Sequence, residues 1–474
     1  MSDAVYDSLI EGGAVVTSGG VREVDVAIKG GRIAALLEPG AGATADEVIG
    51  ATGKHVLPGA VDIHFHVRAP AYPERGTVAS ETRAAAAGGV TTLFEMPISK
   101  PCCATPEVFR SRRELFAREA YVDFALYGAP GTLNPDHVAG MVEEGAIGFK
   151  IFMTEAPKGR DDEFGGLCLP DEGPLLEALR LVAATGLVTS VHAESNPLLK
   201  HFTARLLKTG RNDPETHGES RPPLVEALAI AKLLTLNRAV GGPLHIAHVT
   251  SRMALDTVRM FRSQGMDVTA ETCPQYLLFT EEALSEHGSY AKINPPLRTP
   301  DDREALWEGL RDGTLLVVTT DHSPFTVAEK EEARTDIWAA PPGAPGVEEL
   351  VPGMLHAVAT GRLGLEKAVE LMSTNGARRF GLYPRKGVIE VGADADLVVA
   401  DLEAETVIRQ EDLYTQARCC DRLYDGMAFR GKVLRTLLAG RTIFDGKITG
   451  EPGQGRFICP GGGSVAGGQQ MPTT

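Results

Sequence analysis

Lys150 lies inside a short apolar run, residues 147–153 (IGFKIFM), with Phe149 and Ile151 on either side. An ammonium ion taken out of water without a partner costs several kcal/mol. Burial favours the neutral amine, and a neutral amine beside a metal ion can add carbon dioxide and become a carbamate, an anionic ligand with two oxygens. We therefore expect Lys150 to be carboxylated on its side-chain nitrogen and to bridge two metal ions. The alternative is a lysine at the rim of the fold or paired with Asp321.

Four histidines and an aspartate stand at the ends of segments that read as buried strands: His64 and His66 in DIHFHV, His192 in SVHAE, His248 in IAHV and Asp321 in TTDHSP. One such histidine alone would be assigned to the core, but the recurrence on successive strand ends indicates a shared site. Residues i and i+2 of a strand project to the same side, so His64 and His66 can hold one ion. Imidazole with carboxylate suits divalent cations, and Zn²⁺ is favoured. His245 should face away from this site and is interpreted as structural.

Two metal ions joined by a carbamate would also hold a hydroxide, because coordination lowers the pKa of water to about 7. A neighbouring carboxylate can take a proton and pass it to a leaving group. Asp321 is the predicted proton carrier. The pattern therefore predicts metal-assisted hydrolysis.

The middle of the chain alternates apolar strands with amphipathic helices. The predicted strands fall within residues 59–67, 90–97, 122–129, 146–153, 187–194, 244–251, 267–277 and 315–325. Eight such alternations predict an α/β fold of the TIM (β/α)8 barrel type, in which the carboxyl ends of the strands meet on one face. An open doubly wound sheet is the alternative, but the glycine fingerprint expected after its first strand is missing.

Both chain ends read as short alternating strands with glycine turns. We expect residues 1–57 and 386–458 to form one small β-sandwich domain, and residues 58–385 to form the barrel. Residues 459–474 are rich in glycine and are expected to be a flexible tail.

Composition excludes several classes of protein. The chain has 474 residues and a net charge of −16 without a long basic run, which argues against nucleic acid and anionic membranes as partners. No apolar stretch approaches the roughly 20 residues that span a bilayer, and no signal peptide opens the chain. The 7 cysteines form no regular framework, so we expect reduced thiols in a cytoplasmic protein.

An ordered set of motifs resembles the cyclic amidohydrolases of the amidohydrolase superfamily, namely the allantoinases, dihydroorotases and hydantoinases or dihydropyrimidinases. The motifs are VDIHFHVR, AAAAGGVTTLFEMP, GFKIFM, VHAE, LHIAHVTS, AETCPQYLLF, KINPPLR, TTDHSPF and FGLYPRKGVIEVGADADLVVAD. The resemblance implies a barrel with a small β-sandwich, a binuclear metal site that usually holds zinc, and a homodimer or homotetramer. It also implies hydrolysis of C–N bonds in cyclic ureides and imides.

The same resemblance assigns roles to the residues at the strand ends. His64 and His66 would bind the more buried metal ion, and His192 and His248 the other. Carboxylated Lys150 would bridge both ions. Asp321 would be both a ligand and the general acid and base.

Five residues are candidate substrate contacts: Arg68, Ser99, Glu155, Gln275 and Asn294. Arg68 resembles the arginine that receives the substrate carboxylate in dihydroorotases, a task suited to a bidentate guanidinium; a salt bridge to Glu95 is the alternative. Ser99 in MPIS and the ETCPQY and GLYPRKG segments resemble allantoinases more closely.

The remaining candidates mark departures from family patterns. Gln275 replaces the histidine common in CPHY, and Glu155 stands where hydantoinases have a tyrosine. Asn294 stands where members hydrogen-bond the ring amide, largely through the backbone. The loop over residues 337–350 (IWAAPPGAPGVEEL) either lines or gates the pocket or is a rigid connector.

The sequence therefore favours an allantoinase-type cyclic ureide as the substrate. A dihydroorotase-type carboxylated ring comes second, and a hydantoin, dihydropyrimidine or other cyclic imide third. A catalytically inactive scaffold of the dihydropyrimidinase-related type is the alternative from a different class, but it should have lost metal ligands. A mononuclear deaminase of the same superfamily would normally lack the bridging lysine.

Overall fold

A computed structural model describes residues 5–462, and a parallel eight-stranded sheet forms its centre. The strands are β8 (Ala60–Phe65), β9 (Val90–Glu95), β10 (Asp123–Gly128), β11 (Gly148–Phe152), β12 (Val188–His192), β13 (Leu244–Ile246), β14 (Val268–Thr272) and β15 (Val317–Val318). Each strand pairs with the next in chain order. A parallel bridge between Phe65 and His322, with a 2.9 Å bond from the His66 N–H to the His322 carbonyl, joins the first strand to the end of the last. The predicted barrel is confirmed.

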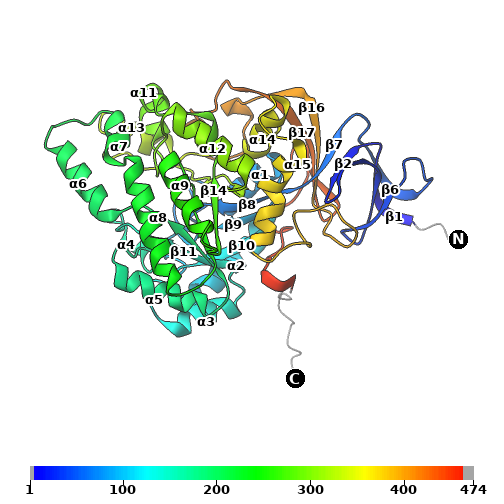
Figure 1. Ribbon diagram of the computed structural model, residues 1–474. Coiled ribbons are helices and arrows are strands. Elements are labelled where there is room, and N and C mark those ends of the chain that lie inside the picture. Colours follow the sequence, from blue (N-terminus) through cyan, green and yellow to red (C-terminus); the bar gives the residue numbers. More distant parts are fainter. Residues whose placement is uncertain (1–4, 463–474) are drawn as a thin grey trace.

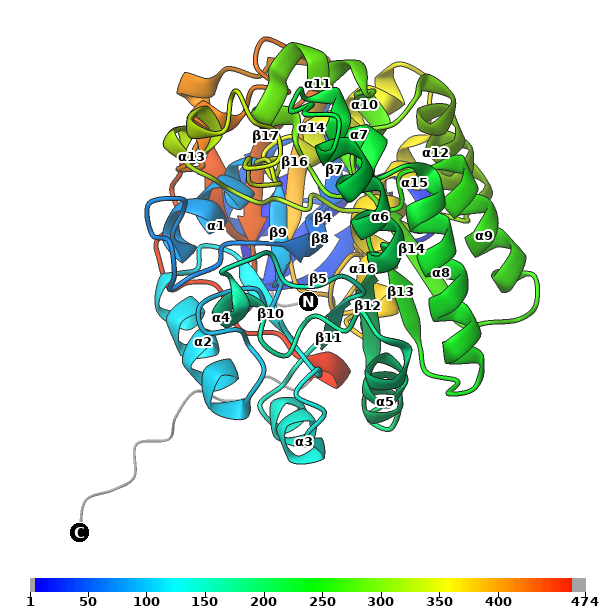
Figure 2. The same cartoon turned by 90° about the vertical axis from the view of Figure 1, so that its left-hand side faces the viewer.

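Helices surround the barrel, as Figures 1 and 2 show. The larger ones are α1 (Val78–Ala87), α2 (Pro106–Glu119), α3 (Pro135–Glu143), α5 (Glu172–Ala183), α6 (Asn196–Leu207), α8 (Pro223–Arg238), α9 (Arg252–Arg262), α12 (Pro300–Asp312) and α14 (Leu350–Ala359). Shorter helices are α4 (Asp161–Phe164), α7 (Glu215–Ser220), α10 (Pro274–Leu278), α11 (Glu282–His287), η1 (Gly288–Ala291), α13 (Val327–Glu332), α15 (Leu365–Val369) and α16 (Asn375–Arg379). Among residues 5–462, no helix combines the length and the apolarity that crossing a membrane requires.

Local sequence explains these elements. All residues of β8, β9 and β10 are buried, as expected for parallel strands covered on both faces. Several helices begin where a side-chain oxygen accepts a free backbone N–H of the first turn. These N-cap residues include Thr77 before α1, Thr105 before α2, Ser251 before α9 and Thr299 before α12.

The two chain ends meet in separate sheets beside the barrel, visible on the right of Figure 1. A six-stranded sheet has the order β18 (Arg441–Asp445), β17 (Ala428–Leu438), β16 (Leu397–Val407), β7 (His55–Pro58), β2 (Ala14–Thr17), β3 (Gly20–Glu23). A four-stranded sheet has the order β5 (Arg32–Leu37), β4 (Asp25–Lys29), β1 (Val5–Glu11), β6 (Thr44–Gly50). One cluster of buried side chains, including Val26, Val56 and Leu397, spans both sheets. Strands from both ends therefore share one core, as predicted.

Little of the predicted flexible tail is described. Cys459 is buried, and the Ile458 N–H donates to the Phe124 carbonyl at 2.8 Å, so the chain still contacts the barrel at this point. Residues 463–474 lie outside the described residues.

Candidate active site

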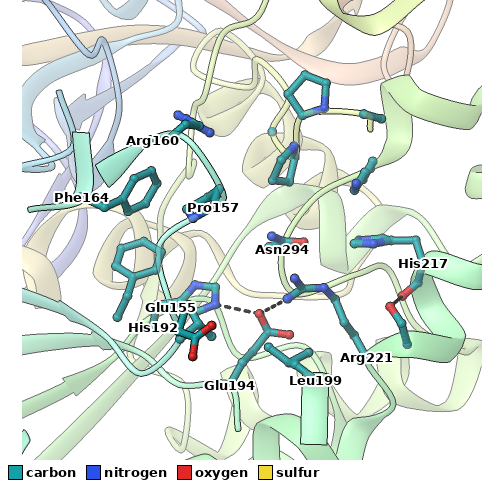
Figure 3. A pocket seen from close by; sticks show the side chains of 18 of the residues that line it. Glu155, Pro157, Arg160, Phe164, His192, Glu194, Leu199, His217, Arg221 and Asn294 are labelled. Carbon is teal, nitrogen blue, oxygen red and sulfur yellow. Dashed lines mark hydrogen bonds and ion pairs between the residues drawn. The ribbon is translucent and has the colours of Figure 1, made fainter. Parts of the chain in front are cut away.

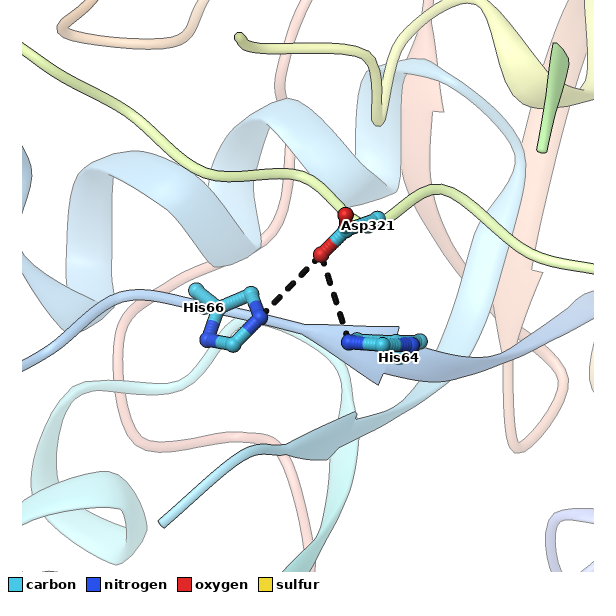
Figure 4. A group of neighbouring side chains, drawn as sticks. All are labelled: His64, His66 and Asp321. Atoms are coloured by element: carbon cyan, nitrogen blue, oxygen red, sulfur yellow. Dashed lines mark hydrogen bonds and ion pairs between the residues drawn. The ribbon is translucent and has the colours of Figure 1, made fainter. Parts of the chain in front are cut away.

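Three of the predicted metal ligands lie together at the carboxyl end of the barrel (Figure 4). Asp321 Oδ1 is 3.2 Å from His64 Nε2 and 3.1 Å from His66 Nε2. Their ligand atoms all lie within 4.8 Å of one another, a group that could hold a metal ion. His64 and His66 extend to the same side of β8 and its continuation, because they are two residues apart. Asp321 follows β15, which is adjacent to β8 across the barrel closure.

Lys150 lies on β11 and is fully buried. Its Nζ is 3.4 Å from His64 Nε2 and 5.4 Å from the centre of the Phe152 ring. Among residues 5–462, no carboxylate oxygen lies within 4 Å of this amine. Burial lowers the pKa of Lys150 to about 8. The amine is therefore close to the imidazole group and without a direct counter-ion in the described structure.

His192 and His248 form a second pair of ligand atoms next to the first. His192 Nδ1 is 3.0 Å from His248 Nε2, and the His248 ring centre is 5.3 Å from that of His64. His248 and Asp321 have φ values of 33° and 49°, in the left-handed region that non-glycine residues rarely occupy. Such conformations persist where the surrounding structure imposes them, commonly at functional sites. The backbone at both positions is thus held in a conformation that directs the side chains into the site.

Two buried carboxylates that the sequence did not single out support the imidazoles. Glu271 on β14 bonds His64 Nδ1 through Oε1 and His245 Nε2 through Oε2, the latter at 2.8 Å. The backbone N–H of His248 also donates to Glu271, at 3.2 Å. Acids in this position fix the orientation and tautomer of metal-binding histidines. His245 bonds the other oxygen of this carboxylate, and its Nδ1 lies 2.7 Å from Thr269 Oγ1, consistent with a structural role.

Glu194 supports the second histidine pair, as Glu271 supports the first. Its Oε2 lies 2.7 Å from His192 Nε2 and also receives the guanidinium of Arg221 (Figure 3). Glu194 follows His192 by two residues, so the VHAE motif contained this signal. Arg221 comes from the distant segment after α7, and local sequence gave no indication of it.

Burial holds three of the four histidines in the neutral form that metal binding requires. Burial lowers the pKa of His66 to about 3, lowers that of His192, and lowers that of His248 well below its usual range. Although burial opposes it, the neighbouring rings of His64, His66 and His248, with a hydrogen bond from His66, lower the pKa of the Asp321 carboxyl. Neutral imidazoles with free lone pairs beside an ionised carboxylate form a donor set that fits divalent cations.

These groups open into a cavity of about 870 Å³. Among the predicted substrate contacts, Arg68, Glu155 and Asn294 line it. The structure does not bring Ser99 or Gln275 to the wall. Ser99 is buried and its hydroxyl donates to the carbonyls of residues 68 and 69, at 2.6 and 2.8 Å. The Gln275 amide donates to the Thr320 carbonyl at 3.1 Å, so both residues support the backbone near the site.

Arg68 is buried, and its side chain contacts no acid among the described residues. Its Nη2 is 2.7 Å from Ser323 Oγ, its Nη1 is 3.5 Å from the Pro324 carbonyl, and its Nε has no partner among the described residues. Glu95 receives the backbone N–H of Arg68 at 3.1 Å instead of its guanidinium. Burial, with the neighbouring Arg160 and Arg75, lowers the pKa of Arg68 to about 9. The expected alternative, a side-chain salt bridge to Glu95, is not formed.

The outer part of the cavity combines charged and apolar groups (Figure 3). Glu155 is half exposed and paired with Lys200, whereas Asn294 Oδ1 is buried without a partner in the described structure. The predicted loop does line the cavity, through residues 338–343. Sequence reasoning missed further lining residues, among them His217, Arg221 and Lys292.

The model of the Amidohydrolase family matches residues 55–443. The chain is 33% identical over 457 residues to an L-hydantoinase from Paenarthrobacter aurescens, covering 96% of this chain and 98% of that one. It is 38% identical over 465 residues to an allantoinase from Rubrobacter xylanophilus, covering 96% of this chain and 98% of that one. A solved L-hydantoinase (dihydropyrimidinase) from Arthrobacter aurescens superposes with a TM-score of 0.90 at 33% identity, covering 96% of this chain and 100% of that one. With its barrel and its cluster of imidazoles, lysine and aspartate, the chain belongs to the amidohydrolase family.

Proposed function

We propose that this protein hydrolyses the ring C–N bond of a cyclic amide, and that an allantoin-type cyclic ureide is its favoured substrate. The observation that carries the proposal is the meeting of Asp321 with His64 and His66 within 3.2 Å at the cavity floor, beside a buried Lys150. Relatives that align over nearly the whole chain carry the names allantoinase, L-hydantoinase and D-phenylhydantoinase.

The four imidazoles and Lys150 would divide between two metal ions. His64 and His66 would hold one divalent cation, His192 and His248 would hold the other, and Lys150 as a carbamate would supply a ligand to both. When bound, the two cations, with Zn²⁺ favoured, supply an activated water and polarise the ring carbonyl. Asp321 would add a carboxylate to this ligand set, and as an ionised carboxylate it could accept a proton and pass it to the departing ring nitrogen.

The protein's own groups prepare this chemistry. Glu271 and Glu194 hold His64 and His192 from behind, so that the opposite ring nitrogens face the site. Asn294 offers a buried amide oxygen without a partner in the described chain, positioned to accept an N–H of a ureide ring. A ureide carries several N–H groups and carbonyls, which suits a cavity lined by both charged and amide side chains.

Arg68 supports a second candidate, a ring that carries a carboxylate, as in dihydroorotate. Its guanidinium is buried at the cavity wall, and no carboxylate oxygen lies within 4 Å of it among residues 5–462. A substrate carboxylate would supply that charge partner. A hydantoin or dihydropyrimidine is the third candidate, supported by the names of relatives.

A turnover panel separates these candidates. The purified, zinc-loaded protein is assayed with allantoin, dihydroorotate, dihydrouracil, hydantoin and succinimide at equal concentrations. The expected result is the highest kcat/KM for allantoin. High turnover of dihydroorotate with none of allantoin would overturn the preference while leaving the reaction class intact.

Metal content tests the reaction class itself. Protein purified without chelator should contain about two divalent ions per chain, and removal of these ions should abolish turnover until Zn²⁺ is restored. A chain that binds no divalent ion would instead be the inactive scaffold.

We also expect a homodimer or homotetramer, which sedimentation would measure, and a cytoplasmic location.

A further inference from the structure

The segment over residues 338–343 walls the cavity with six consecutive residues but belongs to no helix or strand. Its sequence, WAAPPG, contains two prolines, which have no backbone N–H to donate. A segment of this kind cannot be fixed by a regular hydrogen-bond ladder. Other groups must therefore determine its shape.

Lys330, the buried lysine of α13, provides one such anchor. Its Nζ donates to the carbonyls of Ser289, Pro341 and Gly343, at 3.0, 2.8 and 2.8 Å. An ammonium group has three N–H donors, so these contacts use all of them. The Ser289 hydroxyl donates back to the Lys330 carbonyl at 2.8 Å. Lys330 is 1% exposed and is absent from the cavity wall, so it reaches the substrate only through the segment it holds.

Lys292 provides the second anchor. Its Nζ donates to the Ile337 carbonyl at 2.6 Å, and its own carbonyl receives the Gly343 N–H at 2.9 Å. Gly343 has a φ of 142°, and a side chain there would approach Ser323 Oγ to 2.5 Å. Ser323 in turn bonds Arg68 and lies two residues after Asp321. The segment is thus held at both ends, next to the groups assigned to substrate and to proton transfer.

We propose that Lys330, together with Lys292, is a positioning residue for substrate binding, because the two ammonium groups hold residues 338–343 in the shape that walls the cavity. The inference rests on the proposed function in one respect, that this cavity takes the substrate. Loss of Lys330 would leave Asp321 and the imidazoles in place while loosening the wall. The effect should therefore fall on KM more than on kcat.

The test combines kinetics with tryptophan fluorescence. The chain has 2 tryptophans. Trp338 lies in the anchored segment, whereas Trp307 is buried in α12 and donates to the Leu277 carbonyl. In Lys330→Met, which leaves three carbonyls without their donor, we expect KM to rise about 10-fold with kcat within about 3-fold of the parent. Acrylamide quenching should increase, and the increase should vanish when Trp338→Phe is added.

Two further variants keep the test decisive. Lys292→Met should produce the same kinetic pattern and the same increase in Trp338 quenching; because Lys292 also lines the cavity, the quenching is the readout that reports on the segment. The double variant should lose less than the product of the single effects, because both lysines hold one segment. Leu437→Ala, a core truncation in the six-stranded sheet, controls for general destabilisation and should change neither KM nor Trp338 quenching.

Unchanged quenching and KM in folded Lys330→Met would overturn the inference. So would a fall in kcat at constant KM. If Lys330→Met does not fold, unchanged quenching and KM in Lys292→Met would overturn the inference. Failure of the parent on every cyclic amide would instead contradict the proposed function, and the quenching measurement would still decide whether the lysines hold the segment.

Discussion

Lys150 has an imidazole, not a carboxylate, as its nearest described polar neighbour, at 3.4 Å. A buried ammonium in that position would be repelled by any cation that His64 binds. A carbamate would reverse the sign of the interaction, because it would bring negative charge to the same place. The burial that makes Lys150 a poor cation therefore makes it a good precursor of a bridging ligand.

Lys150→Ala would remove this bridging ligand. Without a bridging anion the site should lose at least one divalent ion per chain, and turnover should fall by about 100-fold or more. Metal analysis and kcat/KM are the measurements, and mass spectrometry of the intact parent should detect carbon dioxide on Lys150. Lys432→Ala, at an exposed lysine, is the control. Full activity in Lys150→Ala would favour a mononuclear site.

Arg68 and Arg75 offer a matched pair. Both guanidiniums lie over the Phe325 ring, at 4.8 and 4.7 Å from its centre, but Arg75 is neutralised by Glu329 at 2.9 and 3.1 Å. Arg68→Met should lower kcat/KM for dihydroorotate by about 10- to 100-fold more than for a neutral ring. Arg75→Met should show no such selectivity. Equal losses on acidic and neutral rings would remove the carboxylate-binding role from Arg68.

At the scale of elements, the sequence revealed the strands better than their ends. The apolar runs located all eight barrel strands, but β13 and β15 stop early, at Ile246 and Val318. The chain leaves the sheet at these points to present His248 and Asp321 with positive φ. After β15, Thr320 donates its N–H and hydroxyl to Asp62, at 3.0 and 2.6 Å. Here the backbone forms hydrogen bonds with a side chain distant in sequence instead of with a neighbouring strand. The local sequence therefore does not show where the strand ends.

The same limit explains which site residues were recognised. The two-residue spacing of His64 and His66 is a local signal, and so is the place of Lys150 within an apolar run. Glu271 acts on His64 from a strand far along the chain, and no spacing reveals that contact. The MPIS motif makes Ser99 a candidate, but its hydroxyl donates to backbone carbonyls and does not face the cavity.

The start of α14 contains buried carboxyls with a consequence for stability. Glu348 accepts the N–H groups of Tyr414 and Thr415, at 2.8 and 3.0 Å, and burial raises its pKa from 4.5 to about 8. Between these two values the folded chain keeps a proton that the unfolded chain has lost. Stability from this group is complete below pH 4.5 and is lost as the pH rises to 8. Burial also raises the pKa of the neighbouring Glu349 and Asp421.

Glu348→Gln should therefore become more stable relative to the parent as the pH rises. The amide oxygen can still accept both N–H bonds, and it cannot ionise. Melting temperatures at pH 5.5, 7 and 8.5 would measure this, with a difference that shifts in favour of the variant at each step. Leu437→Ala, which removes no ionisable group, is the control and should give a difference independent of pH. A constant difference for Glu348→Gln would contradict an elevated pKa at that position.

Across the whole molecule, a buried charge cluster joins the barrel to the sheets formed by the chain ends. Lys386 Nζ bonds Asp123 at the start of β10, Asp394 at 3.0 Å, and Asp396 just before β16. Arg456 adds contacts to Asp123 and Asp394, at 2.9 and 3.0 Å. The three aspartates form a group with the spacing of a metal site, but the Lys386 side chain already provides the positive charge among them. Although burial opposes it, the three carboxylates raise the pKa of Lys386.

Lys386→Met tests whether this junction serves stability alone. Removal of one partner leaves buried carboxylates unpaired, at a cost of about 3–5 kcal/mol. Asp123 stands at the opposite end of its strand from the imidazoles, so kcat and KM of the folded fraction should remain those of the parent. Thermal unfolding and active-site titration would measure the two effects separately. Lys54→Met removes a partly exposed pair with Asp401 and should lower the melting temperature far less. A Lys386→Met variant that kept its melting temperature but lost activity would connect the junction to the site at the other end of the barrel.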